Sequence, residues 1–244
     1  ELAEKIEKDR LNEGSYGAIL KNYQGSIHEV NFIEKILATI LAKLSNFIPG
    51  AGIWMNTQRP EWNDANNALV GNGVSMVTLY YLRRFLNFFI TILKNDDSSS
   101  FEISTELYHF FEKLNISFCK IDSNISNKDR KKFVDDIGEV AAEYRDRIYK
   151  SYFSGTKELV DVDRLINFLE TAQKLLEKTI DSNKREDGLY HAYNLVNLDD
   201  NEISIDRLSE MLEGQVGVLS SGYLSDSESL SVLDSLKSSA LFWD

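Results

Sequence analysis

The stretch "VSMVTLYYLRRFLNFFITIL", residues 74–93, decides the fold that we expect for this chain. Apolar side chains occupy nearly every face of a helix drawn through it, and such a helix is buried among other helices or inside a membrane. Arg83 and Arg84 lie near its middle, where each would cost about 2.5–3.5 kcal/mol in a bilayer. The sequence therefore predicts an inner helix from about Ala68 to Leu93, enclosed by other helices, and no membrane as partner.

Helical spacing continues on both sides of this stretch. Apolar residues recur three and four positions apart from Val30 to Ile48, and this stripe stops at Pro49-Gly50, as a helix end should. Further helices are expected at 104–115, 128–151, 158–182, 205–214 and 226–240. Some of these helices are wholly apolar and others are amphipathic. This combination suits a layered assembly in which an inner ring of helices is surrounded by an outer ring. The pattern predicts an all-α fold.

Composition limits the partners and the compartment. A formal net charge of −12 repels nucleic acid and anionic membranes, so neither is expected to bind. Cys119 is the only cysteine and the first ten residues contain no apolar signal core, so a cytoplasmic location is expected. The sequence begins at Glu1 rather than Met and stops directly after a helical pattern. We therefore expect residues 1–244 to form a single helical module that is a piece of a longer protein.

Metal and cofactor motifs are not found in the sequence. His28, His109 and His191 have no Cys or His neighbours at metal-ligand spacing. The loop 122–133 begins like a calcium loop but lacks the glycine of the sixth position and the glutamate of the twelfth. A phosphate loop, a nucleophile elbow and a dinucleotide fingerprint are also missing. No metal and no cofactor are expected.

A second short stretch, "RPEWNDANNALVGNG" at 59–73, surrounds Trp62 with polar side chains just before the apolar helix. A sugar site needs such a set, because a sugar ring stacks on indole while its hydroxyls exchange hydrogen bonds with carboxylates, amides and guanidinium groups. The same residues could instead cap the helix, with Trp62 as a core anchor. The density of donors and acceptors exceeds what one cap uses and favours the sugar site.

Three segments resemble one known family in the family's own order. "EWNDANNALVGNGVS" at 61–75 resembles the Trp-Asn-Asp loop of the cellobiose phosphorylase family of glycoside hydrolases, which includes chitobiose phosphorylase and the phosphorylase-like part of cyclic β-glucan synthase. "EDGLYHAYNLV" at 186–196 and the segment 203–236, which contains "EGQVGVLSSG", resemble two later parts of that family. The resemblance extends from about residue 52 to 236, although residues 95–180 contribute little to it.

The resemblance implies a fold and a reaction. The fold would be an (α/α)6-toroid catalytic module, incomplete in this chain. The reaction would be phosphorylase-like cleavage of a neutral oligosaccharide with inversion, with inorganic phosphate as co-substrate, and Asp64 matches the general acid. The family usually has Gly-Glu-Ser where this chain has Gly73-Val74-Ser75, and a tryptophan where Val216 follows Gln215. These departures leave the identity of the sugar open.

Two alternatives remain at this point. An inverting hydrolase of the same fold needs a base about 6.5–9.5 Å from its acid, whereas a phosphorylase needs only the acid; Glu61 and Glu213 are candidate bases. A non-catalytic sugar-binding or scaffold relative would keep the fold without the chemistry. In either enzyme we expect Asp64 to be catalytic and one concave surface to bind the substrate through Trp54, Arg59, Glu61, Trp62, Asn63, Asn67, Tyr190, His191, Tyr193 and Gln215.

Overall fold

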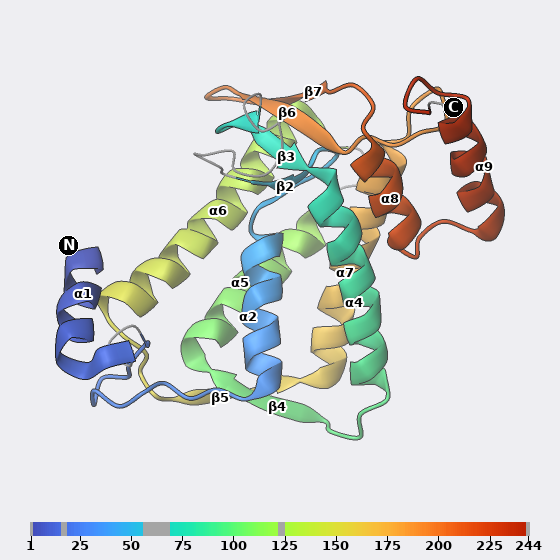
Figure 1. Ribbon diagram of the computed structural model, residues 1–244. Helices are drawn as coiled ribbons and strands as arrows, with labels where there is room; N and C mark the ends of the chain where they lie inside the picture. The colour runs from blue at the N-terminus through green and yellow to red at the C-terminus, as the bar shows by residue number, and fades with distance from the viewer. Residues whose placement is uncertain (1, 16–18, 56–68, 122–124, 243–244) are drawn as a thin grey trace.

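The computed structural model describes residues 2–15, 19–55, 69–121 and 125–242 (Figure 1). The helices are α1 (Leu2–Glu13), α2 (Phe32–Leu44), α4 (Met76–Lys94), α5 (Thr105–Lys120), α6 (Asn127–Lys150), α7 (Val162–Asp181), α8 (Leu212–Ser220) and α9 (Asp226–Lys237). The strands are β1 (Phe47–Ile48), β2 (Gly52–Trp54), β3 (Gly73–Ser75), β4 (Ser100–Ser104), β5 (Lys157–Asp161), β6 (Tyr193–Leu198) and β7 (Ile203–Arg207).

The protein is mixed α/β, so the predicted all-α fold and the (α/α)6 toroid are wrong. Helices make up 57% and strands 16% of the described residues, too much strand for an all-α class. Five strands form an antiparallel sheet in the order β1-β2-β3-β6-β7, and β4 pairs with β5 in a second sheet. In Figure 1 the five-stranded sheet lies across one end of the helices and the β4–β5 ribbon lies across the other.

The error has a local cause in strand β7. The predicted helix 205–214 falls across this strand and the start of α8, because Ile205, Leu208 and Leu212 recur at helical spacing. In the structure Ile205 lies opposite Val196 of β6, and Val196 and Ile203 are buried together. A strand of five residues shows too few alternations to be told from a turn of helix. The helices predicted at 104–115, 128–151, 158–182 and 226–240 are confirmed as α5, α6, α7 and α9, with shifted ends.

Helix α4 starts later than predicted. Gly73–Ser75 belong to strand β3, which pairs with β2 and β6, and the helix begins only at Met76. The Ser75 hydroxyl caps it by accepting a hydrogen bond from the Thr78 N–H at 2.9 Å. Gly73–Ser75 cannot join the helix because they pair in the sheet, although Val74 continues the apolar pattern of the helix.

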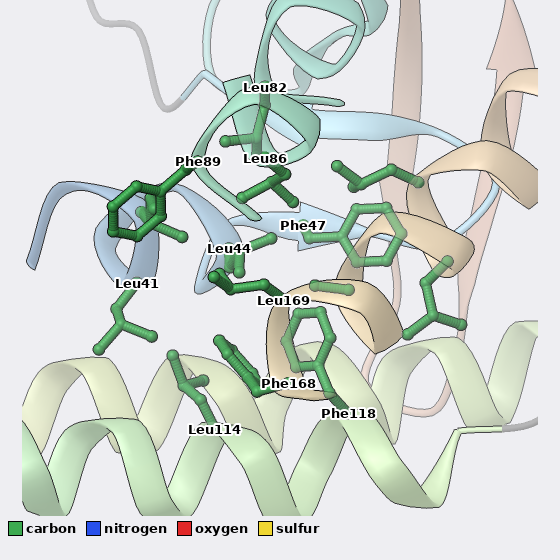
Figure 2. Packing of buried hydrophobic residues seen from close by; sticks show 14 of the residues in the cluster. Leu41, Leu44, Phe47, Leu82, Leu86, Phe89, Leu114, Phe118, Phe168 and Leu169 are labelled. Carbon is green, nitrogen blue, oxygen red and sulfur yellow. The ribbon is translucent and has the colours of Figure 1, made fainter. Parts of the chain in front are cut away.

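One side of α4 forms the centre of the core. Leu79, Leu82 and Leu86 are buried, as the apolar stretch predicts. Figure 2 shows Leu82, Leu86 and Phe89 directed toward side chains of α2 and α7, among them Leu44 and Phe168. The opposite side of α4 faces solvent through Tyr81, Phe85, Phe88 and Ile92, which are 39–58% exposed, so the prediction of burial on all sides is wrong.

The arginine in the middle of α4 has a partner inside the protein. Arg83 is 8% exposed, and its Nη2 lies 2.7 Å from Oε1 of Glu177 on α7. Its Nη1 also donates to the Ser221 carbonyl at 3.1 Å. Among the described residues α4 is the one helix long and apolar enough to cross a membrane, and half of that stretch is buried in the protein.

Candidate functional site

Six of the predicted site residues fall in the segment 56–68, which lies outside the described residues. They are Arg59, Glu61, Trp62, Asn63, Asp64 and Asn67. The structure does describe what precedes and follows this segment, and the candidate site is built from these flanks.

The flanks of segment 56–68 meet in one hairpin. Strands β2 and β3 are antiparallel, with Trp54 opposite Val74. Beyond the strands, the Met55 N–H donates to the Gly73 carbonyl at 3.1 Å, and the Trp54 indole N–H donates to the Gly71 carbonyl at 2.7 Å. The described residues that precede and follow segment 56–68 therefore lie at the same end of the sheet.

Gly73 makes the return of the chain into β3 possible. A Cβ at this position would lie 2.5 Å from the backbone oxygen of Leu69, closer than atoms can approach. Leu69, fully buried, can therefore pack directly under the strand. The glycine that the sequence places before the apolar helix serves this close approach.

Strand β6 brings Tyr193 to the same place. Tyr193 lies opposite Ser75 of β3, and it packs in one apolar cluster with Leu69 and Ala192, against which Met55 also lies. Burial raises the pKa of Tyr193 to about 12, and the negative charge of Glu213 adds to this effect. The phenol is thus neutral near pH 7, and it lies beside both flanks of segment 56–68.

Trp54 flanks the segment from the other face of the sheet. It is half-buried and packs against the cluster of Ile48, Val74 and Val196. Neighbouring residues of a strand point to opposite faces, so Trp54, opposite Val74, and Tyr193, opposite Ser75, lie on opposite faces. Trp54 and Tyr193, both predicted to contact the sugar, therefore lie on opposite faces of the sheet at this end and do not line one surface.

Tyr190 and Gln215 lie together in the interior. Gln215 is fully buried, its Oε1 accepts from the Tyr190 N–H at 2.9 Å, and its Nε2 donates to the Tyr190 carbonyl at 2.8 Å. The Tyr190 side chain is 3% exposed, and burial raises its pKa to about 12. Gly214 allows the close packing, since a Cβ there would lie 2.8 Å from the Tyr190 carbonyl oxygen. Both predicted contact residues thus join α8 to the segment before β6.

His191 faces a different pocket. Its carbonyl accepts from the Tyr80 hydroxyl at 2.9 Å, and its Nδ1 lies 3.0 Å from the Leu208 carbonyl. The ring lines an open pocket of about 530 Å³ together with Arg185 and Arg207. Burial lowers the pKa of His191, and the two arginines lower it further. The structure therefore places His191 apart from the cluster around Tyr193.

A serine, a histidine and a glutamate meet at a place that the sequence did not indicate. His28 Nε2 lies 2.9 Å from Ser104 Oγ, and the Ser104 hydroxyl donates to Glu34 Oε1. Glu34 also pairs with Lys157 at 2.9 Å, and the His28 ring stacks on Phe153 with centroids 3.7 Å apart. These residues lie too far apart in the sequence to form a local motif.

This constellation does not have the geometry of a catalytic triad. In a triad the histidine lies between the hydroxyl and the carboxylate, whereas here the hydroxyl lies between the other two groups. Ser104 is fully buried, and its hydroxyl already donates to Glu34. The pKa of His28 is lowered mainly by burial, although Glu34 opposes the shift. The cluster holds β4 and the segment around His28 to α2.

No group of three His, Cys, Asp or Glu side chains is placed to hold a metal ion within the described ranges. A scan against protein-family models and a search of curated proteins both give no match for this chain. The functional argument therefore rests on its residues and their contacts.

Proposed function

We propose that this chain carries the acid of an enzyme that cleaves glycosidic bonds with inversion, phosphorylase-like, on a neutral oligosaccharide. Asp64 is the general acid, and inorganic phosphate is the co-substrate. The proposal starts from the similarity of Trp62-Asn63-Asp64 and of two later segments to the cellobiose phosphorylase family. It does not include the toroid.

One observation carries the proposal: the three similar segments contact one another, although more than a hundred residues separate the first from the second. Ser75, at the end of the first segment, lies opposite Tyr193 in the second. Tyr190 of the second segment shares two hydrogen bonds with Gln215 of the third. Residues that form one site must be brought together in this way, whereas three chance similarities need not meet.

The reaction would use one carboxylic acid. Asp64 would donate its proton to the oxygen of the leaving sugar while a phosphate oxygen attacks the anomeric carbon from the opposite side. The products are a free sugar and an inverted sugar 1-phosphate, and a second carboxylate is not needed. The sugar contact proposed on the described residues is the half-buried ring of Trp54; those proposed on segment 56–68 are Arg59, Glu61, Trp62, Asn63 and Asn67.

Hydrolysis with inversion is the second candidate, and the position of Glu213 favours it. This half-buried carboxylate is close enough to Tyr193 to raise the pKa of that phenol. Glu213 therefore lies on the Tyr193 side of the flanks of segment 56–68, and a base at this side could activate water. A hydrolase would need such a group about 6.5–9.5 Å from the acid.

A phosphate-dependence assay separates these functions. The intact protein is incubated with a panel of neutral disaccharides, with and without inorganic phosphate, and the products are resolved by ion chromatography. Sugar 1-phosphate formed only with phosphate supports phosphorolysis. Free sugars formed equally in both conditions support the hydrolase, and Glu213→Gln should then abolish their release. Binding of a disaccharide without turnover would identify a sugar-binding relative and contradict both enzymes.

A further inference from the structure

A cavity of about 260 Å³ lies between α5 and α6, at the end of α5 that follows β4 and thus far from the five-stranded sheet (Figure 1). It is lined by four residues of α5 and four of α6: Glu106, His109, Phe110, Lys113, Val140, Glu143, Tyr144 and Arg147. The Glu106 side chain is fully buried, while those of Lys113 and Arg147, which also line the cavity, are each 46% exposed. The cavity therefore has a closed inner end at Glu106 and a charged mouth.

Glu106 is a buried carboxylate that the protein satisfies on one oxygen only. Its Oε1 accepts from the Ser154 N–H at 2.9 Å and lies 3.8 Å from Arg147 Nε. Its Oε2 is buried and has no hydrogen-bond partner among the described residues. Glu34, another buried glutamate, differs because Ser104 and Lys157 bind its two oxygens. A buried oxygen without a donor calls for a partner that is not part of the protein.

The wall and the mouth of the cavity add aromatic and charged groups. Phe110 and Tyr144 stack on each other with centroids 4.7 Å apart. Burial raises the pKa of Tyr144, and the charges of Glu34 and Glu106 add to this, so its hydroxyl stays protonated. At the mouth Lys113 pairs with Glu143. The two acidic and two basic side chains around the cavity cancel in charge.

We propose that this cavity binds a small zwitterion of the α-amino-acid type. The ammonium group donates to Glu106 Oε2, and the carboxylate accepts from the Arg147 guanidinium, which adjoins the other oxygen of Glu106. An α-amino acid carries its ammonium and carboxylate groups on the same carbon atom, and the adjoining Glu106 carboxylate and Arg147 guanidinium offer opposite charges at similarly close spacing. The remaining side chain of the ligand lies along Phe110 and Tyr144. The volume is below the 300–1,000 Å³ or so that is typical of drug-sized ligands, which limits the site to small molecules.

Other ligand classes fit the charges less well. A phosphate or a simple carboxylic acid would bring negative charge against Glu106. A simple amine would satisfy Glu106 Oε2 but leave Arg147 without a new partner. A zwitterion uses both groups, so comparing an amino acid with its decarboxylated and deaminated counterparts tests the assignment directly.

The experiment is an NMR titration of the ¹⁵N-labelled chain 1–244 with L-leucine, L-serine and L-glutamate, each up to about 10 mM. Saturable shifts confined to 106–113, 140–147 and Ser154 are expected with at least one of them. Isopentylamine and 4-methylpentanoic acid, which lack the carboxylate and the ammonium of leucine, should bind at least tenfold more weakly than leucine. If serine or glutamate gives the strongest shifts, ethanolamine or 4-aminobutyrate is the matched amine.

Two variants test which side chains bind the charged groups of the ligand. Arg147→Gln should weaken amino-acid binding at least tenfold and leave amine binding unchanged, while Arg145→Gln, on the exposed part of α6 outside the cavity, should have no effect. Glu106→Gln keeps an oxygen for the Ser154 N–H and should abolish binding. No saturable shift with any of the three amino acids would overturn the proposal. Equal affinity for amino acid and amine, or an Arg147→Gln variant with unchanged affinity, would overturn it too.

Discussion

The buried Gln215 side chain forms two hydrogen bonds with the backbone of Tyr190, accepting at Oε1 from the N–H at 2.9 Å and donating from Nε2 to the carbonyl at 2.8 Å. The pair satisfies the backbone polar groups of Tyr190, whose segment also forms an antiparallel bridge to Lys184. It ties α8 to the segment that leads to Tyr193, so the position of Tyr193 depends on it.

Removing this pair should destabilise the protein strongly. Gln215→Leu leaves the Tyr190 N–H and carbonyl buried without partners, and each such group costs about 1–3 kcal/mol. We expect the free energy of unfolding, measured by urea denaturation, to fall by about 2–5 kcal/mol. Val216→Ala, at a position 49% exposed on the same helix, is the control and should change it by less than about 0.5 kcal/mol. Equal stabilities for the two variants would show that the pair is unimportant.

Two glycine-to-alanine changes test the close approach at the start of β3. Gly73→Ala places a Cβ 2.5 Å from the Leu69 backbone oxygen, and overpacking of this kind costs about 1–3 kcal/mol or more. Gly138→Ala meets no atom within 4 Å in the middle of α6 and should stabilise the protein by about 0.5–1 kcal/mol. Thermal melts followed by circular dichroism measure both. A Gly73→Ala variant as stable as the wild type would mean that Leu69 is not packed under the strand.

The one-sided burial of α4 predicts unequal effects of truncation along this helix. Leu86→Ala removes a fully buried side chain and should cost about 2–5 kcal/mol. Phe88→Ala removes a larger side chain that is 58% exposed, and we expect a loss below about 1 kcal/mol. If Phe88→Ala were as destabilising as Leu86→Ala in chemical denaturation, α4 would be enclosed on all sides, as the apolar stretch alone predicts.

The buried histidine in the serine–glutamate cluster predicts a pH dependence. Burial lowers the pKa of His28 below its ordinary value, so the unfolded chain takes up a proton before the folded protein does. The stabilising contribution of neutral His28 is present above its unfolded pKa of about 6.5 and is lost as the pH falls through the lower folded pKa.

We therefore expect the free energy of unfolding to fall between pH 7.5 and pH 5, and to fall less in His28→Gln. Urea denaturation at a series of pH values measures both slopes. His109→Gln, at an exposed position, serves as the matched control and should keep the slope of the wild type. An unchanged slope in His28→Gln would mean that the ring takes up its proton equally in both states.

The sequence predicts the long amphipathic helices well, because a period of 3.6 repeats many times in α6 and α7. It fails for β2, β3 and β7, whose three to five residues repeat a period of two too few times. The buried arginine also illustrates the limit. In the sequence Arg83 is a charged residue within an apolar helix. Its partner Glu177 is 94 residues away, so no local pattern predicts the ion pair.

The candidate site, like the fold, could be predicted from the sequence only in part. Trp54 could be predicted to lie near segment 56–68 because it is close in sequence, and Tyr193 because its segment and the one that contains Asp64 resemble the same family; the structure places both at the flanks of segment 56–68. The roles of Tyr190 and Gln215 could not be predicted, since a tyrosine and a glutamine in a loop and a helix give no sign that they bind each other. The cavity at Glu106 gave no signal either, because its two helix faces are far apart in the sequence.

The central claim is that Asp64 protonates the leaving sugar, and its most direct test is the turnover of Asp64→Asn in the intact protein on an unactivated neutral disaccharide with phosphate. Asparagine keeps the shape and a hydrogen bond but has no proton to transfer. The account predicts a fall in kcat of about 10²–10⁴-fold with nearly unchanged KM, and a smaller loss on a nitrophenyl glycoside, whose leaving group needs less protonation. Asp199→Asn, in the exposed turn after β6, should leave turnover unchanged. Near-normal turnover of the disaccharide by Asp64→Asn would contradict the claim.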